Sequence, residues 1–514
     1  MRKTFQDILT GSNVDFPIGA EVVAMRGFPL SPDDGKPTAS LNLAMRLLAD
    51  ERISWVSLTD NPGGNPMLPP DAMAMLLNDE YHDNVVLHLT CKDMNRASIE
   101  SALWRNAAAG TNNILALSGD LPMVGNPKRP TGVFDLDSTS LLALISAMNA
   151  GLELPGRGDT MERLPRCSFF AGCTVNPFKR HESELVPQYY KLLRKIGAGA
   201  KWVLPQLGYD MRKFAEVQRF MRENACDQPL IGNVYVLNRV VARMFNQGKL
   251  PGCAVADALY EQIEKYAAGP DKGKQFFQEL AAKQLAVFKG LGFAAGYLGG
   301  LARPEGFFAI IELADSFAKD DWREFYKEIQ FSFPDEFFYF GEPDDAVPSP
   351  DDKQERDHIT LLYRISRLVH ATAFRKGRGL HPLIVRLVRL FDKENLFCQF
   401  LGSACHMIEK DSKHILYGCS DCGDCGLPDT AYLCPMNSCS KNMRNGPCGG
   451  SLHGRCEAGD KDCIWAAAYD RLKHFHELDE LRDRPLITYD ASLKRTSAWK
   501  NFYLERDHTK CPGV

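Results

Sequence analysis

Short apolar runs alternate with amphipathic stretches along the first 300 residues of the chain. We predict buried strands at eight such runs, which cover residues 18–25, 53–59, 84–90, 113–119, 167–173, 200–206, 230–236 and 292–300. Helical periodicity fills the intervals, and two of the helical stretches end in glycine, as helices often do. Strands that are apolar throughout are typical of a parallel sheet covered on both faces. The eightfold strand–helix repeat favours an α/β fold, a (β/α)8 TIM barrel, over an open doubly wound sheet.

The pattern changes after the eighth repeat. Residues 334–357 are acidic and carry several prolines, a composition typical of linkers. Helical stretches follow, then a cysteine-rich segment and a final helix. We therefore divide the chain into a barrel at 1–318, an acidic, Pro-containing linker at 319–365, and a small helical, cysteine-rich metal-binding domain at 366–514.

Composition and charge narrow the functional classes. The 45% apolar and 25% charged residues are ordinary for a soluble protein, and the net charge of −4 lacks the basic cluster that nucleic acid requires. No apolar stretch predicts a signal peptide or a membrane span. Sixteen cysteines without a secretion signal indicate a reducing compartment. We expect a cytoplasmic homo-oligomer that contacts neither nucleic acid nor membrane.

Polar residues gather at the predicted carboxyl ends of the strands, where barrel enzymes build their active sites. Glu21 stands in the apolar run of the first strand, and burial would give it the raised pKa of a general acid. The alternative for Glu21 is a structural carboxylate with a charged partner. Asp120 follows a flexible glycine and suits ligand contact or a helix N-cap. His88 is a candidate ligand contact or a hydrogen-bonded core residue.

Five stretches carry a family resemblance in the same order along residues 15–318: SLTDNPGG, HLTCKDMNR, NILALSGDLP, GVFDLDS and AGAKWVLPQLGYD. Together they resemble the catalytic barrel of methylenetetrahydrofolate reductase. The resemblance implies a flavin-bearing barrel that interconverts 5,10-methylene-tetrahydrofolate and 5-methyl-tetrahydrofolate, an oxidoreductase acting on a CH–NH bond.

The resemblance also implies roles for individual residues. Glu21 matches the acidic residue thought to supply the proton that opens the substrate ring to an iminium ion, and Asp120 matches an aspartate beside the flavin and the pterin. Gln206 matches a substrate-contacting glutamine. Positions that contact or approach the flavin in the family match Thr59, His88, Leu117, Ser118, Gly119, Asp120 and Lys195.

Three departures from the family pattern leave open whether the flavin is FAD or FMN. Glu21 is followed by VVAMRG rather than by aromatic residues and prolines. Gln188 stands where the family has an acidic flavin contact, and Ser118 stands where some members carry arginine.

The cysteines cluster towards the end of the chain. Eight of them follow the spacing C-x2-C-x2-C-x8-C-x4-C-x8-C-x7-C-x6-C, at positions 419, 422, 425, 434, 439, 448, 456 and 463. Three thiols at C-x2-C-x2-C can face one centre, and four thiolates complete an iron–sulfur cluster or a zinc site. We predict two [4Fe–4S] clusters held by Cys419, Cys422, Cys425, Cys434, Cys439, Cys448, Cys456 and Cys463. Cys398 or Cys405 is an alternative for one of these ligands, and zinc is the alternative metal.

This segment resembles the cysteine-rich C-terminal domain of some bacterial methylenetetrahydrofolate reductases, on the motifs CSDCGDCGL, CPMNSC and NGPCGG. It is similar to the separate iron–sulfur small subunit that accompanies the reductase of acetogenic bacteria. The resemblance implies electrons relayed to the flavin from NADH, NADPH or ferredoxin, with a further electron-transfer subunit as a partner.

Two other functional classes stay open. One is a different folate-dependent one-carbon enzyme, such as a methyltransferase or demethylase component. The other is a non-catalytic electron-transfer or assembly subunit with structural zinc, against which the set of Glu21, Asp120 and Gln206 speaks.

Overall fold

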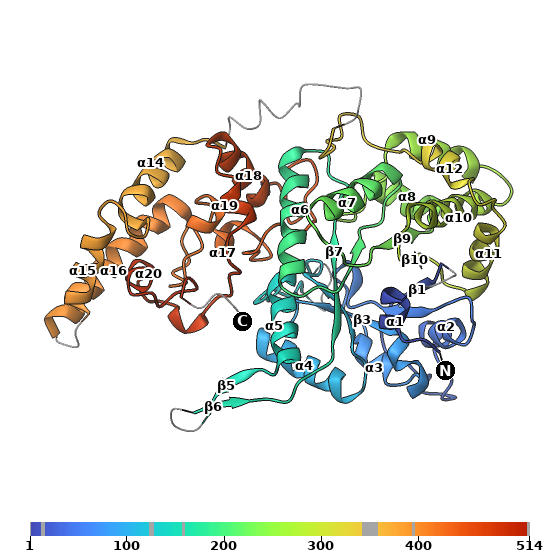
Figure 1. Ribbon diagram of the computed structural model, residues 1–514, viewed down its shortest axis with the longest axis horizontal. Helices are drawn as coiled ribbons and strands as arrows, with labels where there is room; N and C mark the ends of the chain where they lie inside the picture. Colours follow the sequence, from blue (N-terminus) through green and yellow to red (C-terminus); the bar gives the residue numbers. More distant parts are fainter. Residues whose placement is uncertain are drawn as a thin grey trace.

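The eight predicted strands form one parallel sheet that curls into a nearly closed barrel (Figure 1). The computed structural model describes residues 2–11, 16–122, 128–156, 160–341, 358–392 and 396–510. The barrel strands are β1 (Ile18–Val22), β2 (Trp55–Leu58), β3 (Val85–Thr90), β4 (Asn113–Leu117), β7 (Phe170–Val175), β8 (Trp202–Pro205), β9 (Ile231–Tyr235) and β10 (Ala295–Gly299). Each falls within or overlaps a predicted run, so the predicted barrel is confirmed.

The strand order shows how the ring closes. Neighbours in the sheet run β8-β7-β4-β3-β2-β1-β10-β9, and the pairs are parallel. The two ends of this row meet where Val203 of β8 donates its N–H to the carbonyl of Pro229, at 3.0 Å, just before β9. Every residue of β3 is buried, as expected for a strand whose two faces are both covered.

Helices surround the strands (Figure 1). The helices of the barrel part are α1 (Phe5–Thr10), α2 (Ala39–Leu48), α3 (Pro70–Ala74), α4 (Arg96–Ala108), α5 (Ser138–Ala150), α6 (Glu182–Gly197), α7 (Met211–Glu223), α8 (Arg239–Asn246), α9 (Asp257–Ala267), α10 (Lys274–Leu291) and α11 (Pro304–Asp315). A short hairpin of β5 (Glu153–Pro155) and β6 (Met161–Arg163) is inserted before β7.

Aromatic side chains fill the amino end of the barrel. Phe5 of α1 lies 5.1 Å from the ring of Trp55 and 5.3 Å from that of Trp202, measured between centroids. A Cβ at Gly19 would collide with the Trp55 ring, so only glycine leaves room for this packing. These rings form an apolar cluster inside this end of the barrel, whereas the polar strand ends lie at the opposite face.

Part of the predicted linker is folded onto the barrel. Helix α12 (Trp322–Glu328) packs against α10, and the aromatic residues Phe337, Tyr339 and Phe340 pack against the barrel core. The aromatic side chains of this charged stretch explain the difference, because they pack on the barrel, whereas most of the linker's prolines come after it. Residues 342–357, the most acidic part of the predicted linker, lie outside the described residues.

The C-terminal region, residues 358–510, is built from helices and loops (Figure 1). Its helices are α14 (Leu361–Val369), α15 (His381–Phe391), α16 (Leu396–Tyr417), α17 (Pro435–Ser438), α18 (Ile464–His474), α19 (Asp479–Arg482) and α20 (Ala498–Tyr503). Helices α18 and α19 pack on α6 of the barrel, while α14, α15 and α16 lie at the far end of the molecule. Within the described residues, no helix is long and apolar enough to span a membrane.

Candidate active site

A pocket of about 270 Å³ opens at the carboxyl ends of the barrel strands. The nine barrel residues predicted for the site all line this one pocket: Glu21, Thr59, His88, Leu117, Ser118, Gly119, Asp120, Lys195 and Gln206. They come from five strands or strand ends and from one helix, so the barrel topology brings them together from almost 200 residues of sequence. The grouping does not by itself assign a role to any of them.

Glu21 lies in the wall of this pocket on β1. Burial raises the pKa of Glu21 to about 7, and a hydrogen bond from the Tyr297 hydroxyl, at 3.4 Å, opposes the shift only in part. Tyr297 stands on β10, the strand paired with β1, and its hydroxyl also contacts Ser57. No cation within the described residues forms an ion pair with Glu21. The structure of these residues therefore does not support the alternative that Glu21 is a structural carboxylate with a charged partner.

Asp120 and Gly119 form the turn after β4. An Asp120 carboxylate oxygen accepts a hydrogen bond from the Gly63 N–H at 2.9 Å, which ties this turn to the loop after β2. Gly119 has a positive φ of 83°, and a Cβ there would lie 2.9 Å from the Cβ of Thr90. Only glycine therefore brings the backbone this close to the pocket. Asp120 does not cap a helix in this position.

His88 and Thr59 lie deep in the pocket wall. Burial lowers the pKa of His88 to about 4, so its imidazole is neutral near pH 7. Its Nε2 has no hydrogen-bond partner among the described residues. Thr59 has its hydroxyl oxygen engaged by the Ala24 N–H at 2.9 Å, which leaves the hydroxyl proton available. The alternative, a core histidine with its ring nitrogens hydrogen-bonded, therefore does not hold for Nε2 of His88 among the described residues.

The opposite wall carries amides and an ammonium group. Lys195 of α6 donates to the Thr174 carbonyl at 2.7 Å, and burial lowers the pKa of Lys195 to about 8. Gln206 accepts from the Leu207 N–H at 3.0 Å. Gln188 lies about two turns before Lys195 on α6 and lines the pocket. Its Nε2 atom has no hydrogen-bond partner in the described part of the chain.

Several pocket residues were not predicted. Asp60 accepts hydrogen bonds from the backbone and hydroxyl of Thr90, at 2.9 and 2.6 Å, and burial raises the pKa of Asp60. Tyr297 and Asn233 reach the pocket from β10 and β9. The position of Asp60 directly after a predicted strand could have identified it as a candidate site residue. A tyrosine or an asparagine inside an apolar run gives only a weak sequence signal for a functional site.

The C-terminal region supplies part of the same wall. The residues that it contributes are Lys441, Cys448, Gly449, Gly450 and Glu457. Lys441 is 4% exposed, donates to the Gly119 carbonyl at 2.8 Å and forms an ion pair with Glu457. Burial alone would lower the pKa of Lys441, but Cys448, Glu457 and Asp120 outweigh it and raise that pKa. No motif in the sequence predicted this contribution.

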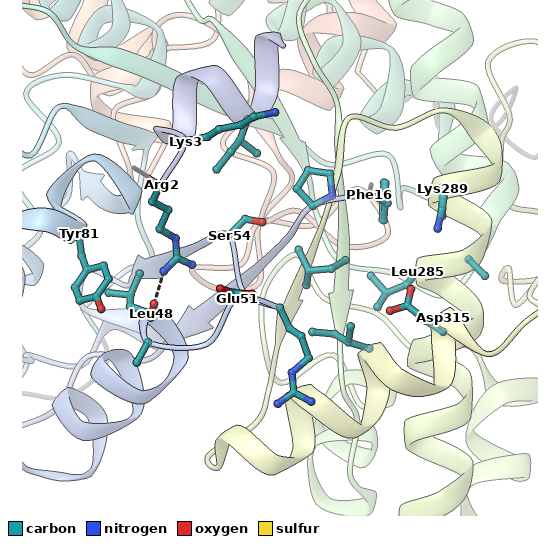
Figure 2. Close-up of a pocket in the computed structure, with 18 residues that line it drawn as sticks. Arg2, Lys3, Phe16, Leu48, Glu51, Ser54, Tyr81, Leu285, Lys289 and Asp315 are labelled. Atoms are coloured by element: carbon teal, nitrogen blue, oxygen red, sulfur yellow. Dashed lines mark hydrogen bonds between the residues drawn. The ribbon is translucent and has the colours of Figure 1, made fainter. Parts of the chain in front are cut away.

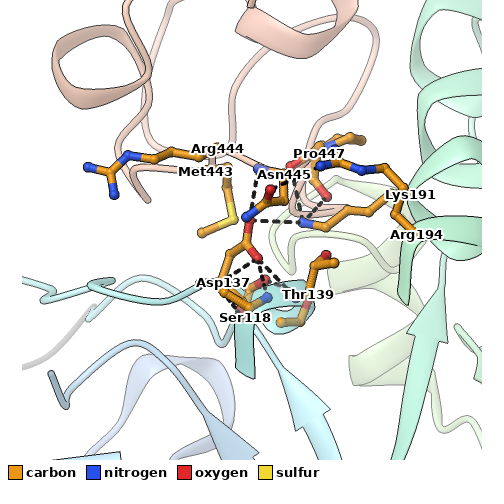
Figure 3. Close-up of polar contacts among 12 residues, drawn as sticks. Ser118, Asp137, Thr139, Lys191, Arg194, Met443, Arg444, Asn445 and Pro447 are labelled. Atoms are coloured by element: carbon orange, nitrogen blue, oxygen red, sulfur yellow. Dashed lines mark hydrogen bonds and ion pairs between the residues drawn. The ribbon is translucent and has the colours of Figure 1, made fainter. Parts of the chain in front are cut away.

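Buried polar contacts hold the loop 441–450 on the barrel (Figure 3). Lys191 donates to the carbonyls of Gly446 and Pro447, both at 3.1 Å, and lies 4.0 Å from Asp137. Asp137 caps α5 with one carboxylate oxygen and accepts the Asn445 N–H at 2.9 Å with the other. Lys191 is 2% and Asp137 is 4% exposed, so these are interior contacts between two parts of the chain.

The eight clustered cysteines form two groups by their electrostatic effects on one another, and we call these groups the first and the second set. Burial raises the pKa of Cys422 to about 12, and repulsion from Cys425, Cys434 and Cys419 adds to the shift. The first set is therefore Cys419, Cys422, Cys425 and Cys434. Burial raises the pKa of Cys439 to about 11, with Cys448 and Cys456 adding, and burial together with Cys448 and Cys439 raises the pKa of Cys463. The second set is Cys439, Cys448, Cys456 and Cys463.

Backbone N–H groups point at the sulfur atoms. Asp421, Met443 and Gly450 donate to Cys419, Cys439 and Cys448 at 3.4, 3.5 and 3.4 Å. Residues in the left-handed conformation, such as Asp421 with φ of 54°, turn the loops so that these N–H groups face the sulfur atoms. No cysteine of the described chain is in a disulfide. No group of three or more His, Cys, Asp or Glu side chains among the described residues is arranged to hold a metal ion.

A larger cavity, of about 1000 Å³, lies at the amino end of the barrel (Figure 2). Residues before β1 and β2, such as Phe16 and Ser54, line it together with Arg2 and Lys289. It contains none of the residues predicted for the site. Size therefore does not locate the chemistry here, and the smaller pocket is the candidate active site.

Comparisons with known proteins identify the family of the chain. A family model described as methylenetetrahydrofolate reductase matches residues 27–289, and one described as methylene-tetrahydrofolate reductase C terminal matches residues 400–490. Methylenetetrahydrofolate reductase 2 of Schizosaccharomyces pombe is 24% identical over 217 residues, which span 39% of this chain but only 30% of the yeast protein.

A solved structure is also similar, at a TM-score of 0.41 and 10% identity, over 60% of this chain and 96% of the other. It is an uncharacterized protein from Clostridium thermocellum that binds two copies of 5-methyl-5,6,7,8-tetrahydrofolic acid. This likeness is too low to add to the argument. The reductase model itself spans just over half of the chain, including the turns after β2, β3 and β4 that form the pocket, and the chain belongs to the methylenetetrahydrofolate reductase family.

Proposed function

We propose that this chain interconverts 5,10-methylene-tetrahydrofolate and 5-methyl-tetrahydrofolate with a bound flavin, FAD or FMN. The observation that carries the proposal is Glu21, a carboxyl group with a pKa of about 7 that shares one pocket with Asp120 and Gln206. Membership of the reductase family supports it.

The pocket residues suit a flavin. His88 Nε2 and Gln188 Nε2 are buried polar atoms without partners among the described residues, and both residues line the pocket. Buried polar atoms in a native protein usually have a hydrogen-bond partner, so these two atoms support the binding of a polar ligand in the pocket. Thr59, His88 and the turn Leu117–Gly119 would hold the ring system, with Lys195 on the side of the ribityl chain and phosphate. When bound, a flavin supplies reversible hydride transfer.

Glu21 would supply the proton for substrate activation. With a pKa of about 7, a large share of Glu21 is protonated at neutral pH, and the acid is strong enough to give the proton up. The acceptor is the bridging nitrogen of the folate, and its protonation opens the five-membered ring to an iminium ion. The hydrogen bond from Tyr297 holds the carboxyl group in place. Asp120, on the turn after β4, would stabilise the cation, and Gln206 would contact the substrate.

We further propose that the two cysteine sets would hold two [4Fe–4S] clusters, which would supply one-electron transfer. Each set has four thiols, the number that a cluster requires, and backbone N–H groups point at one sulfur of the first set and two of the second. The described side chains are not gathered around a metal position, so cluster binding would draw the four sulfur atoms of each set together. Cys448 of the second set lines the barrel pocket itself. This contact supports electron exchange between the second set and a flavin in the pocket. The electron donor is NAD(P)H or ferredoxin.

Analysis of protein purified without oxygen tests the proposal. We expect one flavin and about eight iron atoms per chain, the content of two [4Fe–4S] clusters, with formation of 5-methyl-tetrahydrofolate from the methylene substrate. Protein with flavin and folate turnover but with zinc in place of iron would refute the clusters and leave the reductase. Protein without flavin would refute the proposed reaction and favour another folate-dependent one-carbon enzyme.

A further inference from the structure

The C-terminal region places one ammonium group, that of Lys441, in the described wall of the candidate active site. Its Nζ donates at 2.8 Å to the carbonyl of Gly119, which lies 322 positions away in the sequence, and it forms an ion pair with the Glu457 carboxylate. Both of these charged side chains are almost fully buried. Two distant parts of the chain therefore meet through a buried charge at the turn that precedes Asp120.

A buried ion pair is a costly way to join two segments of a protein. Charged groups lose their hydration inside a protein, and well-packed apolar side chains of similar volume often stabilise the fold as well or better. The same interface already has apolar contacts, because Met443 and Trp465 of the C-terminal region share a buried cluster with Val186 of α6. The position of the Lys441–Glu457 pair in the pocket therefore explains it better than a contribution to stability does.

The charged groups of the pocket show what Lys441 adds. Four carboxyl groups and two ammonium groups line its described wall, and they are those of Glu21, Asp60, Asp120 and Glu457, and of Lys195 and Lys441. Lys195 donates to a carbonyl of β7, whereas Lys441 donates to the turn after β4. Burial lowers the pKa of Lys441, but Cys448, Glu457 and Asp120 together raise it. Lys441 is therefore the pocket cation that interacts with Asp120.

The barrel does not supply an equivalent cation among the described residues. The stem of Lys92 approaches Gly119, but the Lys92 ammonium group pairs with Asp93 and does not line the pocket. The positive charge at this turn comes instead from the C-terminal region, where Glu457 holds Lys441 in place.

We propose that Lys441 is a positioning residue that the C-terminal region supplies to the flavin site. It holds the turn through the Gly119 carbonyl, and its ammonium charge offsets the negative charge of Asp120. The proposal rests on the proposed function, because it requires a flavin in the pocket. A positive charge on this wall favours the anionic reduced form of a flavin and raises its midpoint potential. The C-terminal region thereby tunes the potential at which the barrel works.

Potentiometric titration of the flavin in full-length protein tests the proposal, because the midpoint potential responds to charge rather than to the stability of a loop. K441M removes the positive charge and should lower the two-electron equilibrium constant for flavin reduction about tenfold, a shift of about −30 mV. E457Q removes a negative charge from the same pair and should shift the potential upward by a similar amount.

The variant K441M/E457Q removes both charges and should keep the equilibrium constant within about twofold of wild type. It leaves no unpaired buried carboxylate at position 457, so it stays informative if K441M does not fold. Both variants that lack Lys441 also lose the bond to the Gly119 carbonyl, so both should bind the flavin more weakly than wild type does.

The matched control is K473M, which breaks a different ion pair between the C-terminal region and α6, with Glu182, outside the pocket. Its potential should equal that of wild type. Potentials of K441M and E457Q equal to that of K473M would overturn the proposal, as would equal shifts in K441M and K441M/E457Q. Flavin-loaded protein that shows the opposite shifts but does not turn over folate would keep this role of Lys441 and refute the proposed reaction. Protein that binds no flavin would refute both.

Discussion

The two walls of the candidate active site are built in different ways. On the barrel side, Glu21 and Tyr297 are set by adjacent strands, and a large apolar core beneath them fixes those strands. On the other side, the loop 441–450 has little regular structure and is positioned by buried side chains of the barrel, chiefly Lys191, Lys179 and Asn176.

Because the two walls are built differently, their folding depends on different interactions. The barrel wall needs only the barrel core, so single changes in it should alter chemistry and leave the fold intact. The loop wall needs interior charges and, by our proposal, metal, because a loop-rich segment with few apolar residues gains folding free energy from its ligands. Four tests, with five substitutions among them, probe the contrast from the largest expected effect to the smallest.

The variant E21Q should break the chemistry of the barrel wall alone. We expect transfer to the methylene substrate to fall by about 10²–10⁴-fold, since the proton source is lost, while flavin content and flavin reduction by the donor stay at wild-type levels. Single-turnover kinetics of the two half-reactions measure this, with the exposed E324Q as control. Near-normal folate turnover would make Glu21 a structural residue.

The variant K191M should break the loop wall. It leaves Asp137 and two loop carbonyls without their buried partner, at a cost of about 3 kcal/mol. We expect a lower free energy of unfolding and faster proteolysis in the C-terminal region, with the barrel still folded. Denaturant titration and limited proteolysis report the two effects, and K201M, at an exposed position, is the control. Equal stability of both variants would contradict the interface.

A pair of cysteine variants sharpens the contrast inside the C-terminal region. C422S and C448S should each lower the iron content by about half, because each belongs to a different set of four. Only C448S should also change the absorption and affinity of the bound flavin, since only Cys448 lines the barrel pocket. Loss of all iron in either variant would show that the eight thiols do not form two independent sites.

The variant D120N tests the electrostatics where the two walls meet. Removal of a negative charge near the flavin should raise its midpoint potential, because that charge disfavours the anionic reduced form. A tenfold change in the two-electron equilibrium is about 30 mV, and we expect a shift of this order. Potentiometric titration at one pH measures it, and an unchanged potential would place Asp120 away from the ring.

The same contrast governs what could be predicted from the sequence. Continuous apolar runs located all eight strands, and because a barrel gathers strand ends on one face, the residues after those runs belonged together in space. The arrival of Lys441 and Glu457 at Gly119 depends on side-chain contacts between segments more than 300 residues apart, which no local pattern records. Helix α12 was hidden for a related reason, since its charged sequence becomes helical by packing on α10.

The pH dependence of the folate half-reaction tests the central claim most directly. Reduced protein is mixed anaerobically with 5,10-methylene-tetrahydrofolate in a stopped-flow instrument, and the return of flavin absorbance is followed between pH 6 and 9. Glu21 must be protonated to act, and its pKa is about 7, so the rate constant should be level below that pH and fall about tenfold per pH unit above it. The slope should vanish in E21Q. A wild-type rate that is independent of pH, or reduced flavin that the substrate does not reoxidise, would contradict the account.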